Sequence, residues 1–291
     1  MDEHAQTAAT NLPGPATRIG AVRLAVRDLD AARDFYTRAI GLEPVAGDGA
    51  TTALGIDGRP LVELEAAPDE RPAPRGASGL FHLALLVPER PALAAAVRRV
   101  VDAGARFSGA ADHLVSEALY LNDPEGNGIE IYRDRPRDEW PSVDGRLQMD
   151  TLPIDLDGVM AERPDAPAPA TMEPGTTMGH IHLRVDDLDA AGRFAVGVLG
   201  LDVMVDTYPG ALFVAAGGYH HHIGMNTWGS PRPAQPGSLG LRHYELVVDD
   251  ARALAALAAR AEGAGAGAPD DRNGLRAVDP AGNTVLVRAA G

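Results

Sequence analysis

Three histidines occupy equivalent places in a strand that the chain repeats four times. Each lies five residues before the valine that precedes a turn: His82 before Val87, His180 before Val185 and His243 before Val248. In the first copy the same place, five residues before Val26, holds Ala21. Because side chains alternate along a strand, all four positions share the face opposite the apolar residues. The chain has no cysteine, so a metal here would be bound by His, Asp or Glu, which favours iron, manganese or zinc.

A carboxylate points away from an apolar layer in the stretch from 112 to 132. Residues 123–128, Asp-Pro-Glu-Gly-Asn-Gly, are typical of a tight turn between two strands. In the strand after this turn, Ile129 and Ile131 face one way and Glu130 faces the other. The strand before the turn adds His113 and Tyr120. His113 could be only a loop residue and Tyr120 only a core residue, and Glu130 could be a solvated strand residue.

Internal repeats predict the fold class. Val-Arg-Asp-Leu-Asp-Ala-Ala at 26–32 recurs as Val-Asp-Asp-Leu-Asp-Ala-Ala at 185–191, and Gly-Leu-Phe-His at 79–82 recurs as Gly-Leu-Arg-His at 240–243. Each unit reads as a strand, an Asp-capped helix and shorter strands separated by turns. The expected fold is α+β, with four β-α-β-β-β modules at 19–66, 79–134, 178–228 and 240–289.

The segments outside the modules are expected to be irregular. Residues 1–18 read as a disordered tail, and 135–177 reads as a Pro-rich, acidic linker with one short helix around Leu156–Ala161. This division gives an amino-terminal domain, 19–134, of modules 1 and 2 and a carboxy-terminal domain, 178–291, of modules 3 and 4. The linker is long enough for the modules to pair in more than one way.

Composition limits the classes of partner. The formal net charge of −15 argues against nucleic acid or an anionic membrane as a main partner. No apolar run approaches membrane-spanning length, and the first 17 residues lack the apolar core of a signal peptide. We therefore expect a cytoplasmic protein. The sequence leaves homo-oligomerisation open.

The repeated unit and the polar positions within it resemble the vicinal oxygen chelate superfamily, which includes glyoxalases, bleomycin-resistance proteins and extradiol dioxygenases. The order of three segments, at 79–82, 112–120 and 217–226, resembles bacterial two-domain catechol 2,3-dioxygenase-type proteins. The resemblance implies that modules pair into two cup-shaped sheets. It also implies an Fe(II) site of two first-strand histidines and one last-strand glutamate, with Mn(II) as the alternative metal and no organic cofactor.

The expected ligands are divided unevenly among the modules. Module 2 holds His82 and Glu130, module 3 holds His180, and module 4 holds His243 but has Leu286 at the place of Glu130. Neither consecutive pair of modules completes the triad. We therefore expect modules 2 and 3 to form the working cup with His82, His180 and Glu130 as metal ligands, and modules 1 and 4 to form a vestigial one. His182, on the same face as His180, is the competing ligand.

The resemblance also implies the catalytic residues. His221 fits the acid/base residue, and His113 and Tyr120 fit the groups that hydrogen-bond the substrate, while His222 is a candidate for substrate binding. The choice between His221 and His222 stays open at this point, because the run His220-His221-His222 could also be a surface metal-binding tract.

The implied activity is cleavage of a catechol-like aromatic ring with O₂. The first alternative is another metal-dependent member of the superfamily, a glyoxalase-like isomerase or epimerase. The second is a metal-free protein that binds a small molecule and confers resistance. The retained His and Glu positions favour the dioxygenase over the metal-free binding protein.

Overall fold

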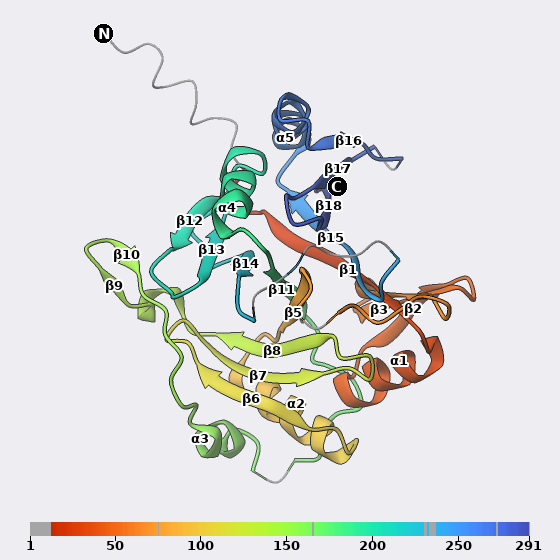
Figure 1. Ribbon diagram of the computed structural model, residues 1–291. Coiled ribbons are helices and arrows are strands. Elements are labelled where there is room, and N and C mark those ends of the chain that lie inside the picture. The colour runs from red at the N-terminus through yellow and green to blue at the C-terminus, as the bar shows by residue number, and fades with distance from the viewer. Residues whose placement is uncertain are drawn as a thin grey trace.

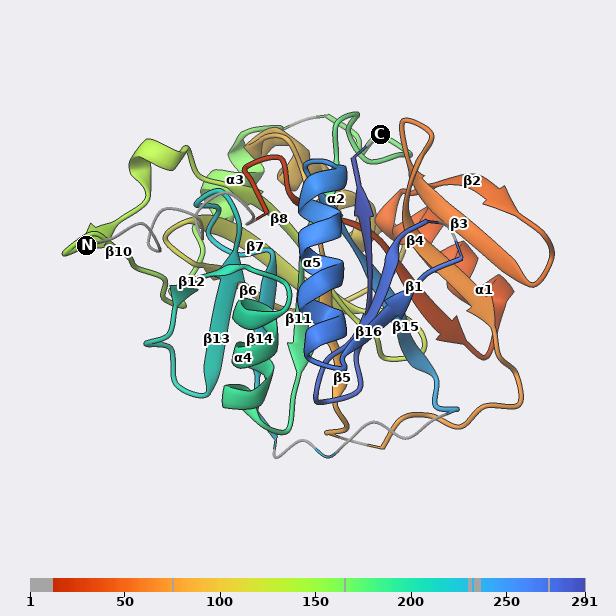
Figure 2. The ribbon, with the colours of Figure 1, turned by 90° about the horizontal axis from the view of Figure 1, so that it is seen from above.

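The computed structural model describes residues 13–74, 76–164, 166–229, 232, 237–271 and 273–290. These residues form two eight-stranded sheets with helices packed against them (Figures 1 and 2). The predicted α+β class and its four modules are confirmed. In each module the first strand lies parallel to the last strand of the same module, as a helical crossover requires.

The first sheet is built from modules 2 and 3. Its strand order is β12 (Asp202–Val205), β13 (Ala211–Ala215), β14 (Ile223–Asn226), β11 (Thr177–Arg184), β5 (Gly79–Leu86), β8 (Gly128–Asp134), β7 (Ser116–Asn122) and β6 (Phe107–Asp112). The central strands β11 and β5 run antiparallel. The expected pairing of the two central modules is therefore confirmed.

The second sheet is built from modules 1 and 4. Its strand order is β16 (Gly267–Pro269), β17 (Leu275–Val278), β18 (Thr284–Ala289), β15 (Gly240–Val248), β1 (Arg18–Val26), β4 (Arg59–Ala66), β3 (Thr51–Ile56) and β2 (Glu43–Gly47). Each sheet takes one module from each half of the sequence. Because β5 pairs with β11 and β1 pairs with β15, neither 19–134 nor 178–291 forms a sheet by itself.

Three of the four crossover helices begin after a capping aspartate, as predicted, whereas the helix of module 2 follows Glu89, whose side chain makes no capping hydrogen bond. The helices are α1 (Leu29–Phe35), which continues as a π-helical turn, η1 (Tyr36–Ile40), then α2 (Arg90–Asp102), α4 (Leu188–Gly197) and α5 (Ala251–Gly263). Asp28 and Asp187 cap α1 and α4, each accepting a 2.9 Å hydrogen bond from the backbone N–H three residues on. These aspartates are helix caps, as expected.

One continuous apolar core contains strand residues of both sheets and residues of these helices. On β5 the core side chains are Leu83 and Leu85, which are fully buried, while His82 and Ala84 alternate onto the opposite face. The burial of Leu83 and Leu85 fixes the register of β5, because a shift of one residue would move the histidine into the core. The fold therefore commits one face of each sheet to packing and leaves the other for chemistry.

The segment between the sequence halves is ordered and packed. It contains η2 (Arg137–Glu139), the short strands β9 (Ser142–Val143) and β10 (Arg146–Leu147), and α3 (Leu156–Ala161), which has the predicted bounds. Val159 and Met172 are buried in the core. Arg99 of α2 donates to the carbonyl of Thr171 at 3.1 Å and so holds the segment against the protein.

Part of the amino-terminal tail, which was expected to be disordered over residues 1–18, is ordered. Residues 1–12 lie outside the described residues, whereas 13–18 are ordered. Thr17 donates a 2.9 Å hydrogen bond to Asp249, and β1 begins at Arg18. This contact anchors the entry to β1 and accounts for the order. Within the described chain, no helix combines the length and the apolarity needed to cross a membrane.

Candidate active site

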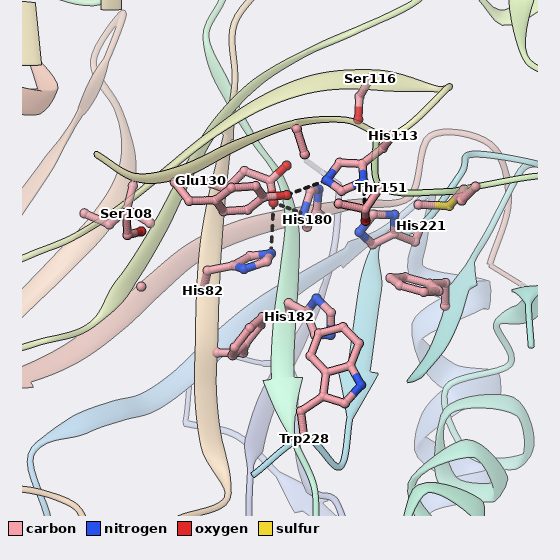
Figure 3. A pocket seen from close by; sticks show the side chains of 18 of the residues that line it. His82, Ser108, His113, Ser116, Glu130, Thr151, His180, His182, His221 and Trp228 are labelled. Atoms are coloured by element: carbon pink, nitrogen blue, oxygen red, sulfur yellow. Dashed lines mark hydrogen bonds and ion pairs between the residues drawn. The ribbon is translucent and has the colours of Figure 1, made fainter. Parts of the chain in front are cut away.

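Three predicted ligands meet on the concave face of the first sheet. Glu130 Oε2 lies 2.9 Å from His82 Nε2 and 3.2 Å from His180 Nε2 (Figure 3). All three residues are buried, and their ligand atoms lie within 4.8 Å of one another. Across the described ranges, this is the one group of three or more His, Asp or Glu residues close enough to hold a metal.

Strand pairing brings the ligands together around a small residue. Ala84 of β5 pairs with Glu130 of β8 on one side and with His180 of β11 on the other. His82 lies two residues before Ala84 and therefore on the same face. Ala84 carries only a methyl group, so no long side chain projects from this position among the three ligands. The site thus depends on the cross-strand register as well as on the ligand residues.

The donor set fits a divalent metal. His82 Nε2 is buried and makes no hydrogen bond of acceptable geometry, and His180 Nδ1 is likewise buried without a partner. Burial lowers the pKa of His180 to about 4, so its imidazole is neutral. Burial alone would raise the pKa of Glu130, but the adjacent His180 and His82 hold it well below its usual range. An ionised carboxylate and neutral imidazoles are the forms that bind metal.

A cavity of about 450 Å³ opens over the three ligands. Its size is typical of a site for a small organic molecule. Aromatic side chains form much of its wall: Phe81, Tyr120, Tyr208, Phe213 and Trp228. The predicted linker also contributes, since Met149, Asp150 and Thr151 line the cavity, and Thr151 Oγ1 lies 2.6 Å from Tyr208 Oη. This segment is therefore part of the site.

His113 and Tyr120 form a hydrogen-bonded pair in the cavity. His113 Nδ1 lies 2.8 Å from the carbonyl oxygen of Asp150, and His113 Nε2 lies 2.6 Å from Tyr120 Oη. A carbonyl can only accept, so Nδ1 carries the proton and Nε2 accepts from the tyrosine hydroxyl. Burial, together with the nearby Glu130, raises the pKa of Tyr120 well above its usual value. Tyr120 is therefore a neutral hydroxyl.

His221 also faces the cavity, and its ring centroid lies 4.0 Å from that of His180. Its Nδ1 lies 2.8 Å from Nδ1 of His220, whose Nε2 lies 2.8 Å from an Asp134 carboxylate oxygen. Because the carboxylate accepts, His220 carries its proton on Nε2, so its Nδ1 accepts from His221 Nδ1. This chain leaves Nε2 of His221 unprotonated. Burial lowers the pKa of His221 well below its usual value, which keeps the imidazole neutral.

His222 does not reach the cavity, so its predicted role in substrate binding is not supported. Its Nδ1 accepts a 3.2 Å hydrogen bond from the backbone N–H of Ala216. Alternation along the chain sends His221 and His222 to opposite faces. The alternative of a surface metal-binding tract is also wrong, because all three histidines from His220 to His222 are buried.

His182 lines the cavity but lies outside the triad. Its Nε2 accepts a 2.9 Å hydrogen bond from the side-chain amide of Asn226. The cavity also contains residues that were not predicted from the sequence: Met149, Asp150, Thr151, Arg184 and Trp228. The alternation of His180, His182 and Arg184 along one strand was the signal that could have found Arg184.

The chain belongs to the Glyoxalase/Bleomycin resistance protein/Dioxygenase superfamily, whose family model matches residues 18–131 and 177–287. The predicted family is therefore confirmed.

Individual proteins similar to this chain are named as dioxygenases and a glyoxalase. A protein of Bacillus subtilis (strain 168) named catechol-2,3-dioxygenase is 40% identical over 277 residues, which cover 93% of this chain and 96% of the relative. Among solved structures, a candidate dioxygenase from Bacillus subtilis subsp. subtilis str. 168 superposes with a TM-score of 0.68 at 16% identity, covering 94% of this chain and 84% of the other. Glyoxalase I from Zea mays gives a TM-score of 0.56 at 16% identity, covering 94% and 92%. Both structures share the fold.

Proposed function

We propose that this protein is a metal-dependent extradiol dioxygenase that cleaves the ring of a catechol-like aromatic with O₂. The observation that carries the proposal is the His82, His180 and Glu130 cluster beneath an aromatic-lined cavity. The 40% identity to the protein named catechol-2,3-dioxygenase supports it. The proposed location of the protein is the cytoplasm.

His82, His180 and Glu130 would hold the metal, which we propose to be Fe(II), with Mn(II) as the alternative. Two histidines and one carboxylate are the ligand set of non-haem iron oxygenases and leave coordination positions open. When bound, such a metal lowers the pKa of the substrate hydroxyls and brings the catechol and O₂ together. The ligand set favours this proposal over a glyoxalase-like isomerase, because that class typically takes a second acidic ligand from the partner module.

His113 and Tyr120 provide a path for one substrate proton. Tyr120 donates to Nε2 of His113, so its oxygen keeps lone pairs that can accept a hydrogen bond from a catechol hydroxyl. A proton taken at Tyr120 Oη can be matched by transfer of the tyrosine proton to His113 Nε2. Asp150 holds the far side of the imidazole through its carbonyl. These two residues therefore orient the substrate and can hold a proton next to it.

His221 supplies a second acid/base group on another wall of the cavity. Its unprotonated Nε2 can take a proton from the substrate and return it later in the reaction. His220 and Asp134 fix the tautomer that leaves this nitrogen available. The aromatic wall packs against the substrate ring and excludes water from it. Groups that can exchange protons with the substrate, Tyr120 with His113 and His221, thus lie on two sides of a bound catechol.

Metal analysis of anaerobically purified protein, followed by addition of catechol and O₂, tests the proposal. We expect about one Fe or Mn per chain and a yellow ring-cleavage product. Glu130→Ala should lose the metal and the activity, because the triad then keeps only two ligands. Glu63→Ala is a matched control, because Glu63 pairs with Arg23 in the second sheet as Glu130 pairs with Ala84 in the first. Metal content unchanged in Glu130→Ala would overturn the site.

A further inference from the structure

The charged groups of the cavity are few. Among its described lining residues, those with a formal charge are Glu130, Asp150 and Arg184. Glu130 belongs to the metal cluster. Asp150 is exposed and lies beside His113, where its backbone carbonyl contacts the imidazole. Arg184 is therefore the one guanidinium or ammonium group that this part of the chain presents to the cavity.

Arg184 lies on the same strand and face as a metal ligand. His180, His182 and Arg184 are successive residues of the cavity face of β11, and all three line the cavity. Four residues of strand span about 13 Å, since each residue rises about 3.3 Å. A catechol ring at the triad can therefore direct a substituent along β11, past His182, toward the guanidinium. The distance favours a substituent with a short spacer.

The guanidinium is held in place but has no counter-ion. Nη1 donates to the carbonyl of Leu80 at 2.8 Å, and Cζ lies 4.8 Å from the centre of the Phe81 ring. No ion pair joins Arg184 to any carboxylate of the described residues. By contrast, Arg90 and Arg133 both pair with Glu117. Burial lowers the pKa of Arg184, as expected for a partly buried guanidinium without an anion beside it.

The space around Arg184 can accept an extended group. Phe81, Arg184 and Trp228 line both the cavity above the metal cluster and an adjoining cavity of about 760 Å³. Figure 3 shows Trp228 on the side of His182 away from His113. The guanidinium thus lies where the two cavities adjoin.

We propose that Arg184 binds a carboxylate on the substrate, so that the preferred substrates are catechols with an anionic side chain. This inference rests on the proposed ring-cleaving function and names its substrate class. A carboxylate matches the planar fork of a guanidinium, which can donate two parallel hydrogen bonds. The net charge of −15 repels anions at a distance, so such a preference has to come from a cation within the cavity.

The test compares 3-(3,4-dihydroxyphenyl)propanoate with its neutral methyl ester, using metal-loaded protein. We expect the wild type to favour the propanoate by roughly 10- to 100-fold in kcat/KM, the range for a charge-assisted hydrogen bond. Arg184→Met should abolish the preference, because kcat/KM for the propanoate should fall much further than kcat/KM for the ester. Arg184→Lys should keep part of the preference, because it keeps the charge without the fork. Calorimetric titration without O₂ should give the same ratios as dissociation constants.

Arg146→Met is the matched control. Arg146 is 71% exposed on β10 and is not a cavity residue, so its loss removes one charge without changing the site and should leave the preference intact. Equal affinity of the wild type for propanoate and ester would overturn the inference. If the ester is still cleaved in that case, the proposed function stands. If Arg184→Met does not fold, Arg184→Lys and the wild-type titration decide the question.

Discussion

The two sheets have the same strand arrangement, but different side chains occupy equivalent places on their concave faces. In the first, Ala84 pairs with His180 and Glu130. In the second, Arg23 of β1 occupies the equivalent place and pairs with His243 and Glu63. The second face therefore keeps one histidine and the glutamate in register. It lacks the other histidine, because Ala21 stands where His82 stands in the first.

A guanidinium takes the central place in the second face. Arg23 Nε lies 2.9 Å from Glu63, and its Nη1 lies 3.6 Å from Glu65. Arg288 pairs with Glu245 at 2.9 Å. The carboxylates of this face are thus paired with arginine side chains, whereas the ion-pair partners of Glu130 on the first face are His82 and His180. The second face thus differs from the first in two ways: it lacks one histidine, and a guanidinium takes the central place.

Reversing these two changes gives the largest expected effect. The double variant Ala21→His, Arg23→Ala restores a second histidine and opens the centre beside His243 and Glu63. We expect its metal content to rise from one to two equivalents per chain. Metal analysis after anaerobic loading measures this, with Ala21→His alone as the control that keeps the guanidinium. An unchanged content in the double variant would mean that the register alone does not define the site.

Substitution of the same residue type in the two faces should separate catalysis from structure. His221→Asn removes the acid/base group, and we expect kcat to fall by roughly 100-fold or more. His243→Asn should leave kcat within about twofold, since His243 lies on the second face. Steady-state kinetics with catechol at saturating O₂ checks both. Equal losses in the two variants would contradict the assignment of one working face.

Chelation should destabilise the first face selectively. A metal present at 1,000 times its dissociation constant stabilises the folded state by about 4 kcal/mol. A strong chelator should therefore lower the Tm of the loaded wild type by several degrees, as followed by circular dichroism. Glu130→Ala should show no such shift. A similar shift in that variant would point to metal bound elsewhere.

The smallest effect is expected from the ion pair that replaces the metal. Arg23→Met removes the partner of Glu63, and both side chains are about one-fifth exposed. Solvent screening limits the loss to about 1 kcal/mol of unfolding free energy. Denaturant unfolding measures this change, and metal content should not change. A loss above about 3 kcal/mol would show that Glu63 is held as a buried charge.

Much of the site was predictable because its positions repeat. His82, His180 and Glu130 were found by counting from a valine or a turn, and the incomplete ligand sets pointed to the central pairing. Glu63 escaped this reasoning, since module 1 lacks the Asp-Pro-x-Gly-Asn turn by which last strands were aligned. The linker residues at 149–151 have no periodic pattern, and their place in the cavity depends on tertiary packing. Whether His221 or His222 faces the cavity depended on strand geometry that residue types do not specify.

The crossed pairing of modules bears on how the protein is made. Module 1 is synthesised before modules 2 and 3, and module 4, its partner, is synthesised after them. The metal cluster can therefore assemble before the second sheet does, with β1 waiting unpaired along one edge. A circular permutant opened between β4 and β5, with module 4 linked to module 1, would place modules 2 and 3 first and modules 4 and 1 last. Each sheet would then be encoded by one uninterrupted stretch of chain, and should mature in the order in which it is translated.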